Sequence, residues 1–265
     1  MLTTSKAAAR AAKIYLKSED CRLSDLAAHC ARQTDLADYP FAADAEKNVL
    51  IYDCPSLLPA LEDPTDRRAL MAEWADALLH GPGVVVLRNA EPDHAMIDRA
   101  SAMFRAMIDE QNRSGTGGGD HFAKPGANDR IWNSLEKHCL RDPENFAQYY
   151  GNAFLALISE AWLGPNYQMT AQLNVVNPGG AAQSPHRDYH LGFMSPAQMA
   201  AYPAHIHGVS PLLTLQGAVA HCDMPVETGP TQFLPYSQRF FEGYLAFGRP
   251  EFQAHFAAHH VQLPL

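Results

Sequence analysis

The chain has 265 residues, of which 47% are hydrophobic, so it can bury a full core as one large domain or as one domain with an extension. Its formal net charge of −9 argues against nucleic acid or an anionic membrane surface as the main partner. No apolar run approaches the roughly 18 residues of a membrane span, and the N-terminal segment lacks the apolar stretch of a secretory signal.

The five cysteines are odd in number, and none of them forms a CxxC pair. This pattern is typical of reduced thiols and does not indicate a disulfide framework or a zinc site. We therefore expect a cytoplasmic protein.

The first 60 residues are expected to form a helical N-terminal extension. Composition predicts a helix over Thr4–Lys17, and Ser24 is expected to cap a second helix that runs through Cys30. A short strand is expected over Val49–Tyr52. The residues that follow are expected to end this strand: the pair Cys54-Pro55, then Pro59 and Pro64.

Residues 61–265 are expected to form the main domain. Thr65 is a candidate N-cap for a helix over Asp66–Leu79. An apolar stripe runs along this helix: Leu70, Trp74, Ala77 and Leu78. The β-branched run Val84–Leu87 predicts a buried strand, and a further helix is expected over Asp93–Asn112.

A glycine-rich stretch, Ser114–Asp120, follows this helix. It lacks the Lys-Ser/Thr pair of a phosphate-binding loop, so we interpret it as a flexible loop. His121, Lys124 and Arg130 add a small basic cluster next to it. The cluster is either ordinary surface charge or part of a lid that helps to hold an anionic ligand.

The second half of the chain changes from helices to strands. Residues Asn133–Trp162 are expected to be helical with an interruption near Pro143. Strands are then predicted over Tyr167–Val176, Pro185–Gly192, Leu212–Ala220 and Thr231–Pro235. Helical stretches are expected over Gln238–Ala258, and Val261–Leu265 is interpreted as the start of another strand.

Within one predicted strand, His186, Asp188 and His190 alternate with Arg187 and Tyr189. Successive side chains on a strand point to opposite faces, so the three alternating groups would share one face. An imidazole and a carboxylate two residues apart are two of the three ligands of the 2-His-1-carboxylate iron site. The HxD pattern alone is weak, because it occurs often by chance on solvated strand ends.

Other motifs in the same order strengthen this interpretation. The pieces are GPN at 164–166, QLNVVNPGG at 172–180, HRD at 186–188, ETGPTQFLPYSQR at 227–239 and the GVVVL strand at 83–87. Together they resemble the phytanoyl-CoA dioxygenase family of Fe(II)- and 2-oxoglutarate-dependent oxygenases. The resemblance implies an α+β, mainly β architecture: a double-stranded β-helix (a cupin-like jelly roll) with N-terminal and flanking helices.

The resemblance also implies the chemistry of the site. His186 and Asp188 would hold Fe(II), and 2-oxoglutarate would be decarboxylated while a C–H bond of a small-molecule substrate is hydroxylated by O2. Because halogenases of the family replace the carboxylate ligand, the intact Asp188 favours hydroxylation. Gln172 and Asn174 share a strand face and are candidates for cosubstrate contacts, although a polar rim is an equal interpretation. The loop Gly115–Gly126 is expected to close over the site when cosubstrate binds.

The third ligand and the arginine that pairs with 2-oxoglutarate are expected further along than this chain runs, so we expect the natural protein to continue past Leu265. If the natural protein ends at Leu265, the third ligand is expected to be one of three histidines: His255, His259 or His260. His190 is expected to contact substrate or a ligand, or to be structural. Loop or surface positions are expected for the remaining late histidines: His205, His207 and His221.

Two other classes stay open. One is a cupin-like metal enzyme that uses His186, Asp188, His190 and a C-terminal histidine without 2-oxoglutarate. The other is a non-catalytic ligand-binding β-sandwich that retains the motif as scaffold. The sequence does not identify the substrate.

Overall fold

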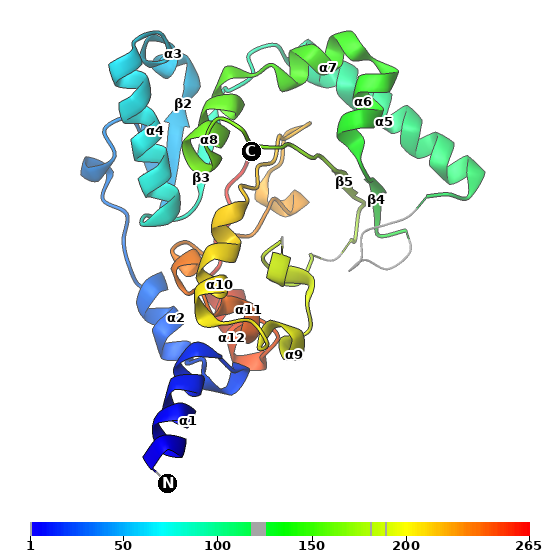
Figure 1. Cartoon of the computed structure of the whole chain (residues 1–265). Helices are drawn as coiled ribbons and strands as arrows, with labels where there is room; N and C mark the ends of the chain where they lie inside the picture. The colour runs from blue at the N-terminus through cyan, green and yellow to red at the C-terminus, as the bar shows by residue number, and fades with distance from the viewer. Residues whose placement is uncertain (1, 118–125, 181, 189) are drawn as a thin grey trace.

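Figure 1 shows the computed structural model, which describes residues 2–117, 126–180, 182–188 and 190–265. The longer helices are α1 (Leu2–Ile14), α2 (Leu23–Cys30), α3 (Cys54–Glu62), α4 (Pro64–Leu79), α5 (His94–Ser114), α6 (Ser134–Arg141), α7 (Pro143–Tyr150), α8 (Ala153–Leu163) and α12 (Pro250–His259). The shorter helices include α9 (Pro196–Met199), α10 (Ala204–Val209) and α11 (Gly243–Ala246). The strands are β1 (Asp44–Glu46), β2 (Val49–Asp53), β3 (Val85–Arg88), β4 (Asn128–Ile131) and β5 (Leu173–Val176).

The first sheet has the order β1-β2-β3, with β2 antiparallel to β1 and parallel to β3. Helices α3 and α4 form the crossover between the two parallel strands, as Figure 1 shows at the upper left. A crossover places helices against the sheet, so β2 is an uninterrupted apolar run rather than an alternating one. Its residues from Val49 to Tyr52 are all buried.

The main core lies between this sheet and helices α3, α4 and α8. The Tyr52 and Trp74 side chains are both fully buried and meet edge to face, with ring centroids 5.8 Å apart. All four residues of the predicted apolar stripe on α4 are buried, which confirms that prediction. Residues between Tyr39 and Ala60 belong to the same core, so the helical extension expected over residues 1–60 shares a core with the rest of the chain.

Two predicted caps are wrong. Asp63, not Thr65, caps α4, because its carboxylate accepts hydrogen bonds from the Thr65 and Asp66 backbone N–H groups. These bonds also lower the pKa of Asp63. Helix α2 begins after Arg22, so Ser24 lies inside it.

Strand β2 ends at Asp53, directly before the Cys54-Pro55 pair, as predicted. Pro55 occupies the first turn of α3, where its missing N–H costs nothing, and Pro59 lies within the same helix. Pro64 is the first residue of α4, a position that tolerates proline for the same reason.

The second sheet pairs β4 with β5 antiparallel and lies beside α5, α6 and α7. Its register places Arg130 opposite Asn174 and Ile131 opposite Leu173. Ile131 is fully buried against Ala100 and Phe104 of α5. Helix α5 ends at Gly115, which has φ of 68°. Glycine suits this left-handed cap because it has no Cβ to clash with the preceding turn.

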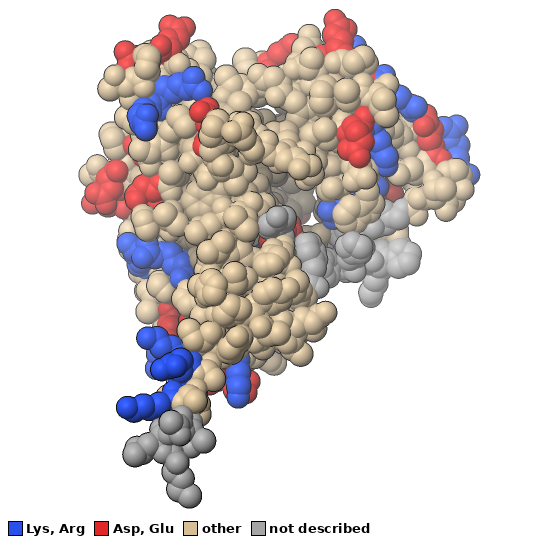
Figure 2. Space-filling view, viewed as in Figure 1, with Lys and Arg blue, Asp and Glu red and all other residues tan. Residues whose placement is uncertain are grey.

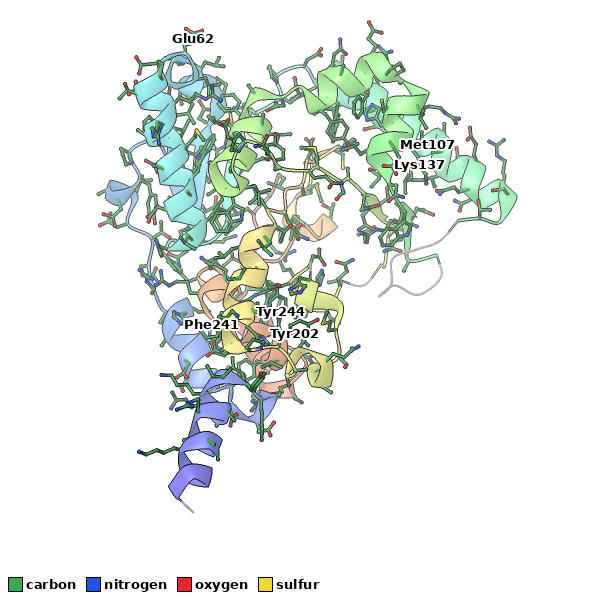
Figure 3. The ribbon with its side chains drawn as sticks, viewed as in Figure 1. Glu62, Met107, Lys137, Tyr202, Phe241 and Tyr244 are labelled. Atoms are coloured by element: carbon green, nitrogen blue, oxygen red, sulfur yellow. The ribbon has the colours of Figure 1, made fainter. Side chains whose placement is uncertain are left out.

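A third core joins α2 to the C-terminal helices α9, α11 and α12. Figure 3 labels Tyr202, Phe241 and Tyr244 in this region. Leu191, Leu245 and Phe252 are almost fully buried here. The segment after Asp188 therefore enters a helical core and does not continue along a sheet.

Several predicted strands do not form among the described residues. His190 has φ of 52° and is the first residue of a 3₁₀ helix (His190–Phe193), so the extended segment ends before it. Another 3₁₀ helix (Ser210–Leu213) covers the first two residues of the strand predicted over Leu212–Ala220. Thr231–Pro235 and the end of the chain meet at the isolated bridge Phe233–Val261. The described residues thus form two small sheets, and a double-stranded β-helix does not appear among them.

Within the described part of the chain, no helix combines the length and the apolar character that a membrane crossing requires.

Candidate metal site

The side chains of His186 and Asp188 converge, although they do not lie on a strand. His186 Nε2 is 3.4 Å from Asp188 Oδ1, and the two side chains are 29% and 31% exposed. The alternation expected for a strand holds over these residues, because extended backbone of any kind places alternate side chains on one side. The two predicted ligands are therefore next to each other and accessible.

Arg187 lies between them and points into the protein. Its Nη2 donates hydrogen bonds to the Ser237 and Phe240 carbonyl oxygens, both at 2.7 Å. Its guanidinium also lies over the rings of Tyr244 and Phe247. Burial lowers the pKa of Arg187 to about 10, so it remains charged at neutral pH. This inward anchor turns its two neighbours outward.

Both candidate ligands are also held by a hydrogen bond on their far side. His186 Nδ1 lies 2.6 Å from the Ser184 carbonyl oxygen. A carbonyl oxygen only accepts hydrogen bonds, so Nδ1 carries a proton and Nε2 is the ring nitrogen that faces Asp188. The side-chain amide of Gln216 donates a hydrogen bond to Asp188 Oδ2, which leaves Oδ1 directed toward His186.

His190 does not share the ligand face. Its positive φ turns it away from the extended segment, and its Nδ1 lies 3.3 Å from Ser210 Oγ. Its ring contacts that of Tyr202 edge to face, with centroids 5.5 Å apart. These contacts favour a structural role for His190.

The C-terminal histidines form their own group on and after α12. The His255 and His259 rings stack with centroids 4.1 Å apart, and His260 stacks on Phe256. No set of three or more His, Cys, Asp or Glu side chains in the described ranges is placed to hold a metal ion. The fallback ligands His255, His259 and His260 are thus not brought to His186 and Asp188.

The predicted cosubstrate residues lie at the second sheet. Gln172, just before β5, accepts the Asn133 backbone N–H at 2.7 Å. Asn174 lies on β5 and is 3.5 Å from the Asn128 side chain. Both are exposed, so their side chains remain accessible to a ligand. The interpretation as a polar rim stays open on this geometry.

His207 is neither in a loop nor at the surface, contrary to expectation, whereas His221 lies in a loop, as expected, but is half-buried. His207 is fully buried on α10, where its Nε2 contacts the Met199 carbonyl oxygen at 3.0 Å. His221 joins Ser101 Oγ and Tyr149 Oη, each at 2.8 Å, and so ties a late segment to α5 and α7. Burial lowers the pKa of both imidazoles. Sequence analysis missed them because neither residue lies in a periodic pattern.

A cleft of about 560 Å³ lies elsewhere, between α5, β4 and α6. Figure 3 labels Met107 and Lys137 on its walls. It includes none of the predicted ligands. Of the basic cluster, Arg130 stacks on Trp132 with its guanidinium carbon 4.1 Å from the ring centroid. His121, Lys124 and most of the predicted lid lie outside the described residues.

Charge is distributed unevenly over the face in Figure 2. Acidic and basic side chains are mixed over α5 and α6, basic atoms gather over α1, and the surface around α9 and α10 is largely uncharged. This mixture does not form the continuous basic stripe that a nucleic-acid phosphate backbone attracts.

The site is an accessible pair of one histidine and one carboxylate, two of the donor types that transition metals bind in proteins. The family model for phytanoyl-CoA dioxygenase (PhyH) matches residues 65–265, and the chain belongs to this family. A comparison with curated proteins gives no significant match, and neither does one with solved structures. Membership in a family of iron dioxygenases supports an oxygenase function.

Proposed function

We propose that the protein is an Fe(II)- and 2-oxoglutarate-dependent dioxygenase that hydroxylates a small organic substrate. The observation that carries this proposal is the facing pair of His186 Nε2 and Asp188 Oδ1. Because Nδ1 is bound to the Ser184 carbonyl oxygen, Nε2 is the nitrogen left for a ligand, and it lies 3.4 Å from Asp188 Oδ1. An imidazole nitrogen and a carboxylate oxygen at this separation are donors that a divalent metal ion binds together.

The donor set fits two of the three ligands of a 2-His-1-carboxylate site. His186 would bind through Nε2 and Asp188 through Oδ1, since the far atoms of both groups are already hydrogen-bonded. A bound Fe(II) with 2-oxoglutarate would supply the oxidation of an unreactive C–H bond. The proposal also requires a third donor, which the described residues do not bring to the pair.

The contribution of the chain itself is orientation. Arg187 anchors the segment from inside, and the Ser184 carbonyl selects the imidazole tautomer that a metal requires. Gln172 and Asn174 are proposed to hydrogen-bond the cosubstrate, since both amides are exposed at the sheet that precedes the site. Each of these groups would act by holding a ligand in one geometry.

Metal titration under anaerobic conditions tests the proposal. We expect Co(II), used as a spectroscopic substitute for Fe(II), to bind the wild-type protein, and His186→Ala or Asp188→Ala to weaken binding at least about 10-fold. His205→Ala is the matched control, because His205 is an exposed histidine on α10. Equal affinity in all four proteins would refute the metal site.

Decarboxylation of 2-oxoglutarate separates the main proposal from its alternatives. Iron should stimulate release of succinate from 2-oxoglutarate, and Asn174→Ala should raise the cosubstrate concentration needed. Metal binding without this stimulation would favour the cupin-like metal enzyme. Failure to bind metal at all would favour the non-catalytic sandwich.

A further inference from the structure

Gln216 is placed to control the Asp188 carboxylate. Its side-chain amide donates to Asp188 Oδ2, while Oδ1 of the same carboxylate faces His186 Nε2. A carboxylate can offer either oxygen, or both, to a cation. With Oδ2 engaged by an amide N–H, the other oxygen, Oδ1, remains directed at His186 Nε2.

The backbone around Gln216 is fixed by contacts that do not involve the site. The Trp162 indole N–H donates to the Thr214 carbonyl oxygen at 2.9 Å. The next residue, Leu215, packs against the main core. Because adjacent side chains of an extended segment point to opposite sides, Gln216 is turned away from the core and toward Asp188.

The same segment is tied down again at its far end. His221 bonds Ser101 of α5 and Tyr149 of α7, both at 2.8 Å. Among the described residues, the chain from Thr214 to His221 has no strand partner, yet it is held at both ends by helices. This support explains how an exposed glutamine on an irregular segment can have a defined position.

We infer that Gln216 is a positioning residue that sets how Asp188 binds the metal. The inference rests on the proposed function, and it assigns a role to a residue outside the HxD motif. Removal of the amide frees Oδ2, so the carboxylate can rotate and bind through either oxygen or both. The metal then loses a preorganised ligand and its coordination geometry changes.

Anaerobic Co(II) titration of Gln216→Leu tests the inference. Leucine approximates the size of glutamine but has no amide. We expect Co(II) affinity to fall about 10-fold, within the range found when hydrogen-bond partners of metal ligands are removed. We also expect the visible absorption bands of the bound Co(II) to shift at saturation, which a simple loss of stability would not cause. Gln253→Leu is the control, because Gln253 is an exposed glutamine on α12.

The outcomes separate the two proposals. If His186→Ala weakens Co(II) binding but Gln216→Leu changes neither affinity nor spectrum, the positioning role is overturned and the metal site stands. If the wild-type protein binds no Co(II), both are overturned. A matching loss of affinity in Gln253→Leu would also overturn the positioning role, since the effect would not depend on the contact with Asp188.

Discussion

Replacement of Arg187 by methionine should destabilise the protein strongly, although the residue is charged and only half-buried. Methionine retains apolar contact with Tyr244 but removes the charged donor of the Ser237 and Phe240 carbonyl oxygens, each of which keeps one backbone N–H donor. Each hydrogen bond from a charged group contributes about 1.5–3 kcal/mol, and a partly desolvated cation–π contact adds about 1 kcal/mol. Allowing for solvent at the exposed side, we expect a loss of about 3–5 kcal/mol in the free energy of unfolding.

Thermal and urea denaturation followed by circular dichroism measure this loss. For a chain of this size, about 1 kcal/mol corresponds to a shift of roughly 2–4 °C, so the midpoint should fall by roughly 6–20 °C. Arg67→Met is the control, because the Arg67 pair with Glu160 at 3.1 Å is exposed and worth less than about 1 kcal/mol.

The reasoning would be refuted if the two arginine variants lost similar stability. That result would mean that the inward contacts of Arg187 are no stronger than a surface ion pair. The same variant should also weaken Co(II) binding, since Arg187 directs His186 and Asp188 outward. Unchanged Co(II) affinity in a destabilised variant would show that the anchor does not position the site.

Two further predictions concern the cores. Leu157→Ala should lower the free energy of unfolding by about 2–5 kcal/mol, because Leu157 is 2% exposed in the main core. Leu140→Ala is the control, because Leu140 is 84% exposed and its loss should change stability by less than about 0.5 kcal/mol. Similar losses for the two variants in urea denaturation would contradict the assigned core. Burial lowers the pKa of His138 and His207 below the ordinary 6.5, so the unfolded chain binds more protons as pH falls through 6.5. Stability should therefore be full above that pH and should decline below it. A midpoint that is constant from neutral to mildly acidic pH would contradict this.

Some features follow from the sequence because they depend on short-range patterns. The stripe of Leu70, Trp74, Ala77 and Leu78 recurs at helical spacing, and all four residues are buried as predicted. The convergence of His186 and Asp188 also follows from local geometry, since any extended backbone brings alternate side chains together. The family resemblance rests on such local motifs and is confirmed over residues 65–265.

Other features required the tertiary structure. A strand forms only when a partner strand lies beside it, so the alternating pattern of Leu212–Ala220 was not enough to predict its structure. Contacts of Trp162 and His221 with helices hold this segment instead of a sheet. The Gln216 contact with Asp188 joins residues 28 apart in sequence, a separation that no periodicity encodes. Local sequence thus determined which groups lie at the site, whereas long-range packing decided what orients them, because orientation depends on neighbours that only the folded chain brings together.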